Sequence, residues 1–486
     1  VPCYAGGIDL DYPLEQLLKQ TDDNLAKGFR AIKMKVGRAR LSEDVARVKA
    51  MRAHLGEDFP LMADANMRWG VDEAIRAARA TGREVVIAGR AMRNTIEAAR
   101  LCHRKVVALT PGDRSALGNL GLVMKAGGAV GSAIAWQRRA LATHDDAGSW
   151  NSLGDSLQAT GDVGGALAAY RRSVELGGSA AWHSNLVFCL CYDERVTSEA
   201  LFGEVRAWAA RHAPKAGSKP GRRAASAKPK VGVLSSDLRD HPVGRNVLGI
   251  FEHHRRVSLH GYAEVAREDA TTARFRSHAE GWTSTVGMGD EQVAERMRKD
   301  GLDLLIVLAG HTAKNRPLVA AFGGAPVQAS FHDLTTSGLE AMDWWITDGV
   351  LHPEGTKERF TEKLWRLPHF YLHRPPDEAP DVGPLPSEAG GHITFVSCNN
   401  PAKLTDGVVR LWSQVLKGVP GSRLLLKYVG WFGDEAVRSR VIARFEANGI
   451  GRDRLDLRAT DLVRTEQLGL LNEADIALDQ IGRAHV

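Results

Sequence analysis

The stretch Lys230-Val-Gly-Val-Leu-Ser-Ser-Asp237 is a short apolar run that ends in small polar residues. Runs of this length and composition are typical of strands that are buried on both faces of a parallel sheet. Comparable runs follow at residues 302–308, 325–331 and 344–348. The sequence therefore predicts a parallel α/β domain over residues 230–372.

A second set of strands follows a proline-rich crossover at residues 373–390. From residue 391 to 480, predicted strands alternate with predicted helices: strands 392–397, 422–427 and 455–458, and helices 406–417 and 434–449. This alternation predicts a second doubly wound half. The cleft between two such halves is the default place to expect a ligand.

Residues 106–213 are helical and repetitive. Leu120, Leu153 and Leu186 recur at a spacing of 33 residues, which is close to the tetratricopeptide period. Small residues in the pattern would let paired helices approach closely, and aromatic residues such as Trp136 and Tyr170 would fill the gap to the next helix. The array is either a peptide-binding groove or a scaffold packed against the next domain, and the sequence leaves both open.

The N-terminal residues 1–80 alternate strand and helix, the pattern of a parallel sheet. We expect Ser42 to cap a helix that Gly56 stops. The predicted elements are a helix at 14–28, a strand at 31–36, a helix at 43–55, a strand at 60–66 and a helix from 72. Residues 81–105 form a separate short strand, turn and helix.

The formal net charge of +6 is concentrated in one segment. The linker at residues 214–229, together with Lys230, holds six Lys or Arg side chains and no acid. No aromatic residue interrupts it to stack on bases, so it predicts a solvated linker rather than a nucleic-acid arm.

Composition narrows the class of protein further. The five cysteines are scattered without a Cys-x-x-Cys pair, which supports neither a zinc site nor a disulfide framework. No signal peptide is evident, and no apolar run approaches the roughly 20 residues that a membrane span needs. We expect a cytoplasmic protein with no bound cofactor and no nucleic-acid or membrane partner.

Several ordered motifs between residues 106 and 479 resemble the O-linked GlcNAc transferase family of the SPINDLY type. They are Ser235-Ser-Asp-Leu-Arg-Asp-His241-Pro242, Gly310-His-Thr-Ala-Lys-Asn-Arg316, Ala325-Pro-Val-Gln328, Asn399-Asn-Pro-Ala-Lys403 and Ala474-Asp-Ile-Ala-Leu-Asp479. The resemblance implies a GT-B fold of two Rossmann-like halves. It also implies an inverting, metal-independent transfer of a sugar, from UDP-GlcNAc or another nucleotide sugar, to Ser or Thr of a protein that the repeats would bind.

The resemblance also implies roles for individual residues. His241 matches a histidine that contacts donor and acceptor, and it is a candidate for positioning the substrate or for acting as the base. Lys403 matches the lysine that meets the diphosphate, and Asn400 lies where the family contacts the nucleotide. We expect His311 to make a structural hydrogen bond and Asp237 to order its loop.

The chain departs from the family pattern in two places. Residues 331–337 are one residue shorter than the family's loop and lack its glycines, which let backbone approach the donor. The sequence stops after residue 480 of the second half, and residues 481–486 do not continue the pattern and look non-native. We therefore expect the second half to be incomplete, and this chain to have little or no transferase activity.

The first 80 residues resemble a different family, the enolase superfamily in its mandelate racemase and muconate-lactonising branch. Lys33-Met-Lys35 and Asp64-Ala-Asn66 carry the resemblance. It implies a fragment of a βα barrel in which Asp64 would be the first of three Mg²⁺ ligands, but no later strand supplies the other two. Residues 81–103 weakly resemble a β-CASP ribonuclease fragment.

These joined resemblances predict a chimaeric or mis-assembled chain. Two other functions stay open from sequence: a Mg²⁺-dependent racemase or lyase fragment, and a non-enzymatic repeat adaptor.

Overall fold

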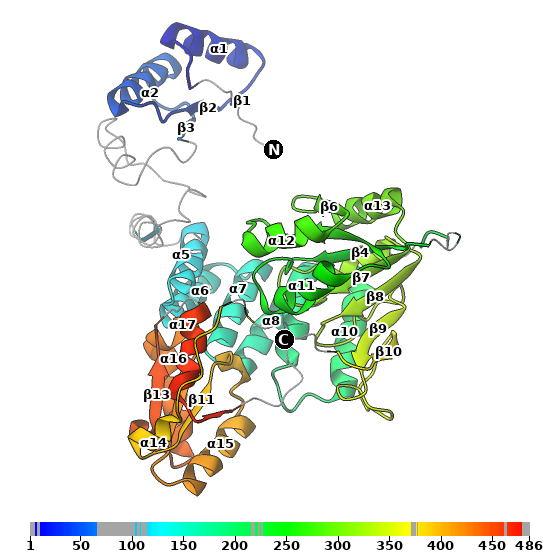
Figure 1. Ribbon diagram of the computed structural model, residues 1–486. Coiled ribbons are helices and arrows are strands. Elements are labelled where there is room, and N and C mark those ends of the chain that lie inside the picture. The colour runs from blue at the N-terminus through cyan, green and yellow to red at the C-terminus, as the bar shows by residue number, and fades with distance from the viewer. Residues whose placement is uncertain are drawn as a thin grey trace. The chain divides into compact units, whose positions relative to one another are not determined.

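A computed structural model describes residues 5–6, 10–65, 103–104, 107, 114–214, 219–221, 224, 227–370, 376, 378–460 and 464–478 (Figure 1). The chain divides into two compact units, Val1–Gly127 and Gly128–Val486. The helix predicted from residue 72, most of the short segment at 81–105 and the tail at 481–486 lie outside the described residues.

The first unit contains a small parallel sheet in the order β1-β2-β3. Its elements are β1 (Ala5–Gly6), α1 (Leu14–Ala26), β2 (Ile32–Lys35), α2 (Leu41–Leu55), β3 (Leu61–Asp64) and α5 (Arg114–Ala126). Leu17, Met34 and Met51 are buried together between the helices and the sheet. The predicted strand–helix alternation of residues 14–64 is therefore confirmed.

The predicted cap of α2 is wrong. The helix begins at Leu41, with Arg40 as its N-cap residue, and no side chain caps it. The carboxylate of Asp44 instead accepts hydrogen bonds from the backbone N–H groups of Gly37 and Arg38, each at 2.8 Å. These bonds fix the backbone at residues 37 and 38, ahead of Ser42. The predicted stop at Gly56 is confirmed, since its φ of 82° favours glycine.

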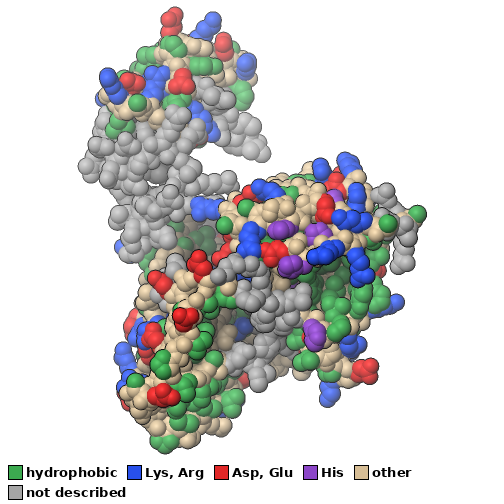
Figure 2. Space-filling view, viewed as in Figure 1, with side chains coloured by type: hydrophobic (Ala, Val, Ile, Leu, Met, Phe, Trp, Pro, Cys, Tyr) green, Lys and Arg blue, Asp and Glu red, His purple; other side chains and the backbone are tan. Residues whose placement is uncertain are grey.

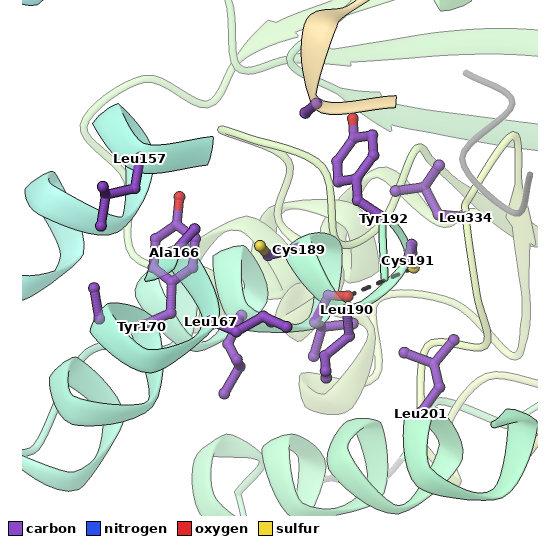
Figure 3. Close-up of a cluster of buried hydrophobic side chains, with 14 of the residues drawn as sticks. Leu157, Ala166, Leu167, Tyr170, Cys189, Leu190, Cys191, Tyr192, Leu201 and Leu334 are labelled. Carbon is purple, nitrogen blue, oxygen red and sulfur yellow. Dashed lines mark hydrogen bonds between the residues drawn. The ribbon is translucent and has the colours of Figure 1, made fainter. Parts of the chain in front are cut away.

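The second unit begins with a stack of helices that follows the predicted repeats. They are α6 (Val130–Thr143), α7 (Ala147–Ala159), α8 (Val163–Glu175), α9 (Ala180–Leu190) and α10 (Ser198–His212). A Cβ atom on Gly154 would lie 2.7 Å from ring carbons of Tyr170, so glycine is required where that ring packs across the helix pair. Tyr170 joins a core with Leu157, Leu167 and Leu190 (Figure 3).

The first sheet has seven parallel strands in the order β10-β9-β8-β7-β4-β5-β6. The strands are β4 (Lys230–Ser235), β5 (Ser258–Ala263), β6 (Gly281–Ser284), β7 (Leu304–Leu308), β8 (Val327–Phe331), β9 (Trp344–Asp348) and β10 (Lys363–Leu367). Helices α11 (Pro242–His253), α12 (Ala270–His278) and α13 (Asp290–Asp300) alternate with them. The strand order reverses between β4 and β7, which is where such folds bind ligands.

The second sheet has four parallel strands in the order β13-β12-β11-β14. Its strands are β11 (Thr394–Ser397), β12 (Arg423–Lys427), β13 (Leu455–Arg458) and β14 (Ile476–Ala477). Its helices are α14 (Pro386–Gly390), α15 (Asp406–Gly418), α16 (Glu435–Ala447) and α17 (Arg464–Gly469). Phe395, Trp412 and Phe445 are buried in the core between the sheet and these helices.

The helical repeats contact both sheet domains of this unit. The backbone N–H of Gly131 donates to Asp434, at the start of α16, at 3.1 Å. Glu194, which follows α9, accepts from the Thr405 hydroxyl at 2.7 Å. On the other side, Arg206 of α10 donates to the carbonyl oxygen of Gly338 at 3.1 Å. The repeats therefore pack against both halves, as expected of the scaffold alternative.

Candidate functional site

The carboxyl end of β4 carries a closed hydrogen-bond network. Asn315, which follows β7, accepts from the Ser235 hydroxyl at 2.9 Å and from the Ser236 backbone N–H at 2.8 Å. Its amide group donates to Oδ2 of Asp237 at 3.0 Å, and the Ser236 hydroxyl donates to Oδ1 at 3.1 Å. Asp237 therefore orders its loop, as predicted, and ties the two strands together at the point where the sheet order reverses.

Helix α11 begins directly after this loop, with His241 as its N-cap residue. The imidazole Nδ1 accepts a hydrogen bond from the backbone N–H of Val243 at 3.4 Å. The first turn of α11 requires glycine at position 244, because a Cβ atom on Gly244 would lie 2.3 Å from the carbonyl oxygens of both Asp237 and Arg239. The backbone of α11 thus fits tightly against the loop that holds Asp237.

His241 lies at the surface between opposing charges. Its side chain is 31% exposed, and Nδ1 lies 3.5 Å from Oδ1 of Asp237. Burial lowers the pKa of His241, while the Asp237 carboxylate opposes that shift. On the face shown in Figure 2, histidine and Lys or Arg side chains gather over α11 and α12. Such a surface suits an anionic or hydroxyl-rich ligand.

His311 makes the structural hydrogen bonds predicted for it. Its Nε2 donates to the carbonyl oxygen of Ser337 at 3.2 Å, and its Nδ1 accepts from the Ser184 hydroxyl at 3.1 Å. The ring is fully buried and packs edge-on against Trp208 with centroids 4.6 Å apart. Burial lowers the pKa of His311 to about 4, so the imidazole is neutral at pH 7.

The loop after β8 forms without the glycines that the family resemblance leads one to expect. His332 takes a positive φ of 56°, a conformation that glycine adopts more cheaply. Its ring is buried against Phe331 and Phe370, which holds it there. Glu362 accepts from the backbone N–H of Ser337 at 2.8 Å. Packing and a buried carboxylate thus stabilise this loop.

The second sheet presents Asn400 and Lys403 on the short turn after β11. The turn is a 3₁₀ helix, Pro401–Lys403, and the Asn400 side chain caps it by accepting from the backbone N–H of Ala402 at 3.0 Å. Nearby, β12 ends in Lys427, which is only 2% exposed and lowers the pKa of Cys398 against the larger upward effect of burial. The sequence prediction did not include Lys427, although a lysine at the end of an apolar strand is a signal that could have indicated it.

A hollow of about 270 Å³ lies beside the carboxyl end of β13, lined by Arg458, Thr460, Glu466, Gly469, Leu470 and Glu473.

The predicted site residues are divided between the two sheet domains. His241 belongs to the first sheet domain, whereas Asn400 and Lys403 belong to the second. A ligand that touches all three residues must therefore span both halves.

The residues that resemble the enolase superfamily meet at the carboxyl ends of β2 and β3. Oδ2 of Asp64 lies 2.8 Å from Nζ of Lys35 and 3.5 Å from Nζ of Lys33. Within the described ranges, no group of three or more His, Cys, Asp or Glu side chains is placed to hold a metal ion. Mg²⁺ prefers six oxygen ligands, so this pair of ammonium groups on one carboxylate does not fit it.

The described part of the chain contains no helix that is both long and apolar enough to cross a membrane. None of the three cysteines that the structure describes, Cys189, Cys191 and Cys398, forms a disulfide.

Known proteins match the chain in two separate regions. Residues 190–374 match Glycosyl transferase family 41, and residues 16–87 match the Enolase C-terminal domain-like family. The probable UDP-N-acetylglucosamine–peptide N-acetylglucosaminyltransferase SPINDLY of Arabidopsis thaliana is 34% identical over 257 residues, 51% of this chain and 28% of that protein. The chain thus spans less than a third of the length of this relative.

The N-terminal region has its own relative. The 3,6-anhydro-alpha-L-galactonate cycloisomerase of Streptomyces coelicolor is 69% identical over 80 residues, 16% of this chain and 22% of that protein. The enolase-like match runs on to residue 87, and the comparisons give the expected ribonuclease resemblance of residues 81–103 no support. That prediction is not kept.

Among solved structures, a mutant O-GlcNAc transferase of Thermobaculum terrenum superposes with a TM-score of 0.74 at 30% identity, covering 80% of this chain and 75% of that one. The fold, the order of the motifs and the sequence identity therefore agree. The chain belongs to glycosyl transferase family 41 through its O-GlcNAc transferase-like region, to which an enolase C-terminal domain-like segment is joined at the N-terminus.

Proposed function

We propose that residues 230–372 and 391–480 are the two halves of a GT-B module for protein O-glycosylation, which moves a GlcNAc-type sugar from a nucleotide donor to Ser or Thr of a protein. The observation that supports it best is the position of His241, at the reversal point of the first sheet and on the first turn of α11. Ligands of open parallel sheets bind at this position.

The two halves supply different parts of the proposed site. An inverting transfer needs the acceptor hydroxyl placed against the anomeric carbon, and it needs the charge that grows on the leaving diphosphate to be neutralised. His241 supplies the first half's polar contact. Lys403 supplies a point charge for the diphosphate. Asn400 lies on the same turn and contacts the nucleotide.

We assign the protein acceptor to the helical repeats. Among the described residues, Asn185 of α9 donates to Asn151 of α7 at 2.9 Å, so amide side chains from successive repeats lie side by side. Amide groups in such an arrangement can hydrogen-bond an extended peptide backbone, which makes the acceptor independent of a strict sequence.

The proposal is tested by incubating the full chain with radiolabelled UDP-GlcNAc and a library of Ser- and Thr-containing peptides. We expect specific binding of UDP-GlcNAc with little or no labelled peptide, because the sequence predicts low turnover. Replacing His241 by alanine should lower any transfer about 100-fold or more, the usual effect of losing one well-placed polar group. The absence of both binding and labelling would overturn the proposal.

A further inference from the structure

The two nitrogens of His241 have different surroundings. Nδ1 faces the N-terminus of α11 and accepts from Val243, whereas Nε2 makes no hydrogen bond or ion pair with a described residue. A neutral imidazole has one N–H and one lone pair, and the bond made by one nitrogen fixes the proton on the other. The surroundings of Nδ1 therefore decide what Nε2 offers to a ligand.

The N-terminus of α11 needs an acceptor at this place. The first helical residue, Pro242, has no N–H, so the first N–H that requires a partner belongs to Val243. The lone pair of Nδ1 provides that partner. Protonating Nδ1 would leave the Val243 N–H without its acceptor and would place a positive charge at the positive end of the helix dipole.

Asp237 accepts no hydrogen bond of normal length from Nδ1, because its Oδ1 lies 3.5 Å away. Both of its oxygens already accept hydrogen bonds, from the Ser236 hydroxyl and from the Asn315 amide. Oδ1 of Asp237 and Nδ1 of His241 form an ion pair only when the imidazole is protonated. The other charged groups that act on His241 are Arg239, Arg245 and Asp240, and the two arginines disfavour the charged ring.

We infer that His241 carries its single proton on Nε2, and that it serves as a hydrogen-bond donor to a ligand oxygen rather than as the general base. The lone pair that a base would need points at Val243 and is shielded from the site. This role rests on the proposed function for the nature of the ligand, which would be a hydroxyl or phosphate oxygen of the nucleotide sugar or the acceptor. The proton position itself follows from the helix cap alone.

The proton position can be measured by NMR without any turnover. The full chain, labelled with ¹⁵N only at its 17 histidines, is recorded at pH 7 in a long-range ¹H–¹⁵N correlation. His241→Asn identifies the signals of His241 and retains a good N-cap side chain. His311 is an internal reference, because its two hydrogen bonds impose the same Nε2–H form.

We expect His241 to show an unprotonated Nδ1 and a protonated Nε2, as His311 does. A proton on Nδ1, or a doubly protonated ring at pH 7, would overturn the inference. Adding UDP-GlcNAc should then shift the Nε2 signal of His241. A bound nucleotide sugar that leaves the Nε2 signal in place would contradict the donor role. If no nucleotide sugar binds, the proposed function fails, whereas the spectrum of the free chain still decides the proton position.

Discussion

The hydroxyl of Ser184 donates to Nδ1 of His311 at 3.1 Å, so one buried hydrogen bond joins the helical repeats to the first sheet. Nε2 of the same ring donates a hydrogen bond to the carbonyl oxygen of Ser337. Position 337 lies in the loop that the family resemblance associates with the donor. A change in the repeats can therefore alter the loop through a single imidazole.

Removing the hydroxyl in Ser184→Ala should destabilise the second unit. Nδ1 of His311 would remain buried without a donor, at a cost of about 1–3 kcal/mol. Denaturant unfolding followed by tryptophan fluorescence measures the loss. Ser156→Ala is the matched control, because the Ser156 hydroxyl is buried and has no hydrogen-bond partner among the described residues. That control should be neutral or stabilising, and equal losses in both variants would contradict the role of the Ser184 bond.

Asp333 should make stability depend on pH. Burial raises its pKa from 3.8 to about 7, against two backbone N–H groups, of His311 and Leu334, that favour the ionised form. The folded chain then binds the proton more tightly than the unfolded chain does. The stability that Asp333 contributes is fully present below about pH 4 and is lost as the pH rises to about 7.

Asp333→Asn removes this titration while keeping an oxygen for the two N–H groups. Relative to the variant, the parent chain should lose up to about 4 kcal/mol of unfolding free energy between pH 4 and pH 7. Unfolding curves of both proteins across that range measure the difference. The exposed Asp453→Asn is the control and should run parallel to the parent. A difference between Asp333→Asn and the parent that does not change with pH would show that Asp333 ionises normally.

Two glycines of α11 should respond to alanine in opposite directions. Gly244→Ala places a Cβ atom 2.3 Å from two carbonyl oxygens of the Asp237 loop, so the helix start and His241 must move. We expect a loss of about 1–3 kcal/mol, the usual cost of overpacking, and weaker nucleotide-sugar binding. Gly249→Ala meets nothing within 4 Å and should stabilise the chain by roughly 0.5–1 kcal/mol. Thermal unfolding of the two variants reports both signs, and a stabilised Gly244→Ala would refute the tight fit.

Much of the fold could be read from the sequence because its central strands are continuous apolar runs. The strand predicted at residues 344–348 coincides with β9. In contrast, β5 contains His260 and Gly261, and β6 and β10 lie at the edges of the sheet, so none of the three has such a run. Edge strands are half exposed, and tertiary pairing rather than local composition determines them.

The site could be predicted only in part for a similar reason. The motif located His241, but its cap bond depends on where α11 begins relative to the loop. The Ser42 cap failed because the carboxylate of Asp44, in the first turn of α2 itself, binds the backbone before the helix. Lys427 was missed because burial of a strand-end lysine depends on the layer of helices above it.

The most direct test of the central claim is isothermal titration of the full chain with UDP-GlcNAc. Binding should be present in the parent and weakened at least about tenfold in Lys403→Met, which removes a charge-assisted contact to the diphosphate. Lys417→Met, in the same half but exposed near the end of α15, should bind like the parent. Equal affinities for all three proteins, or no binding by the parent, would contradict a nucleotide-sugar site that uses Lys403.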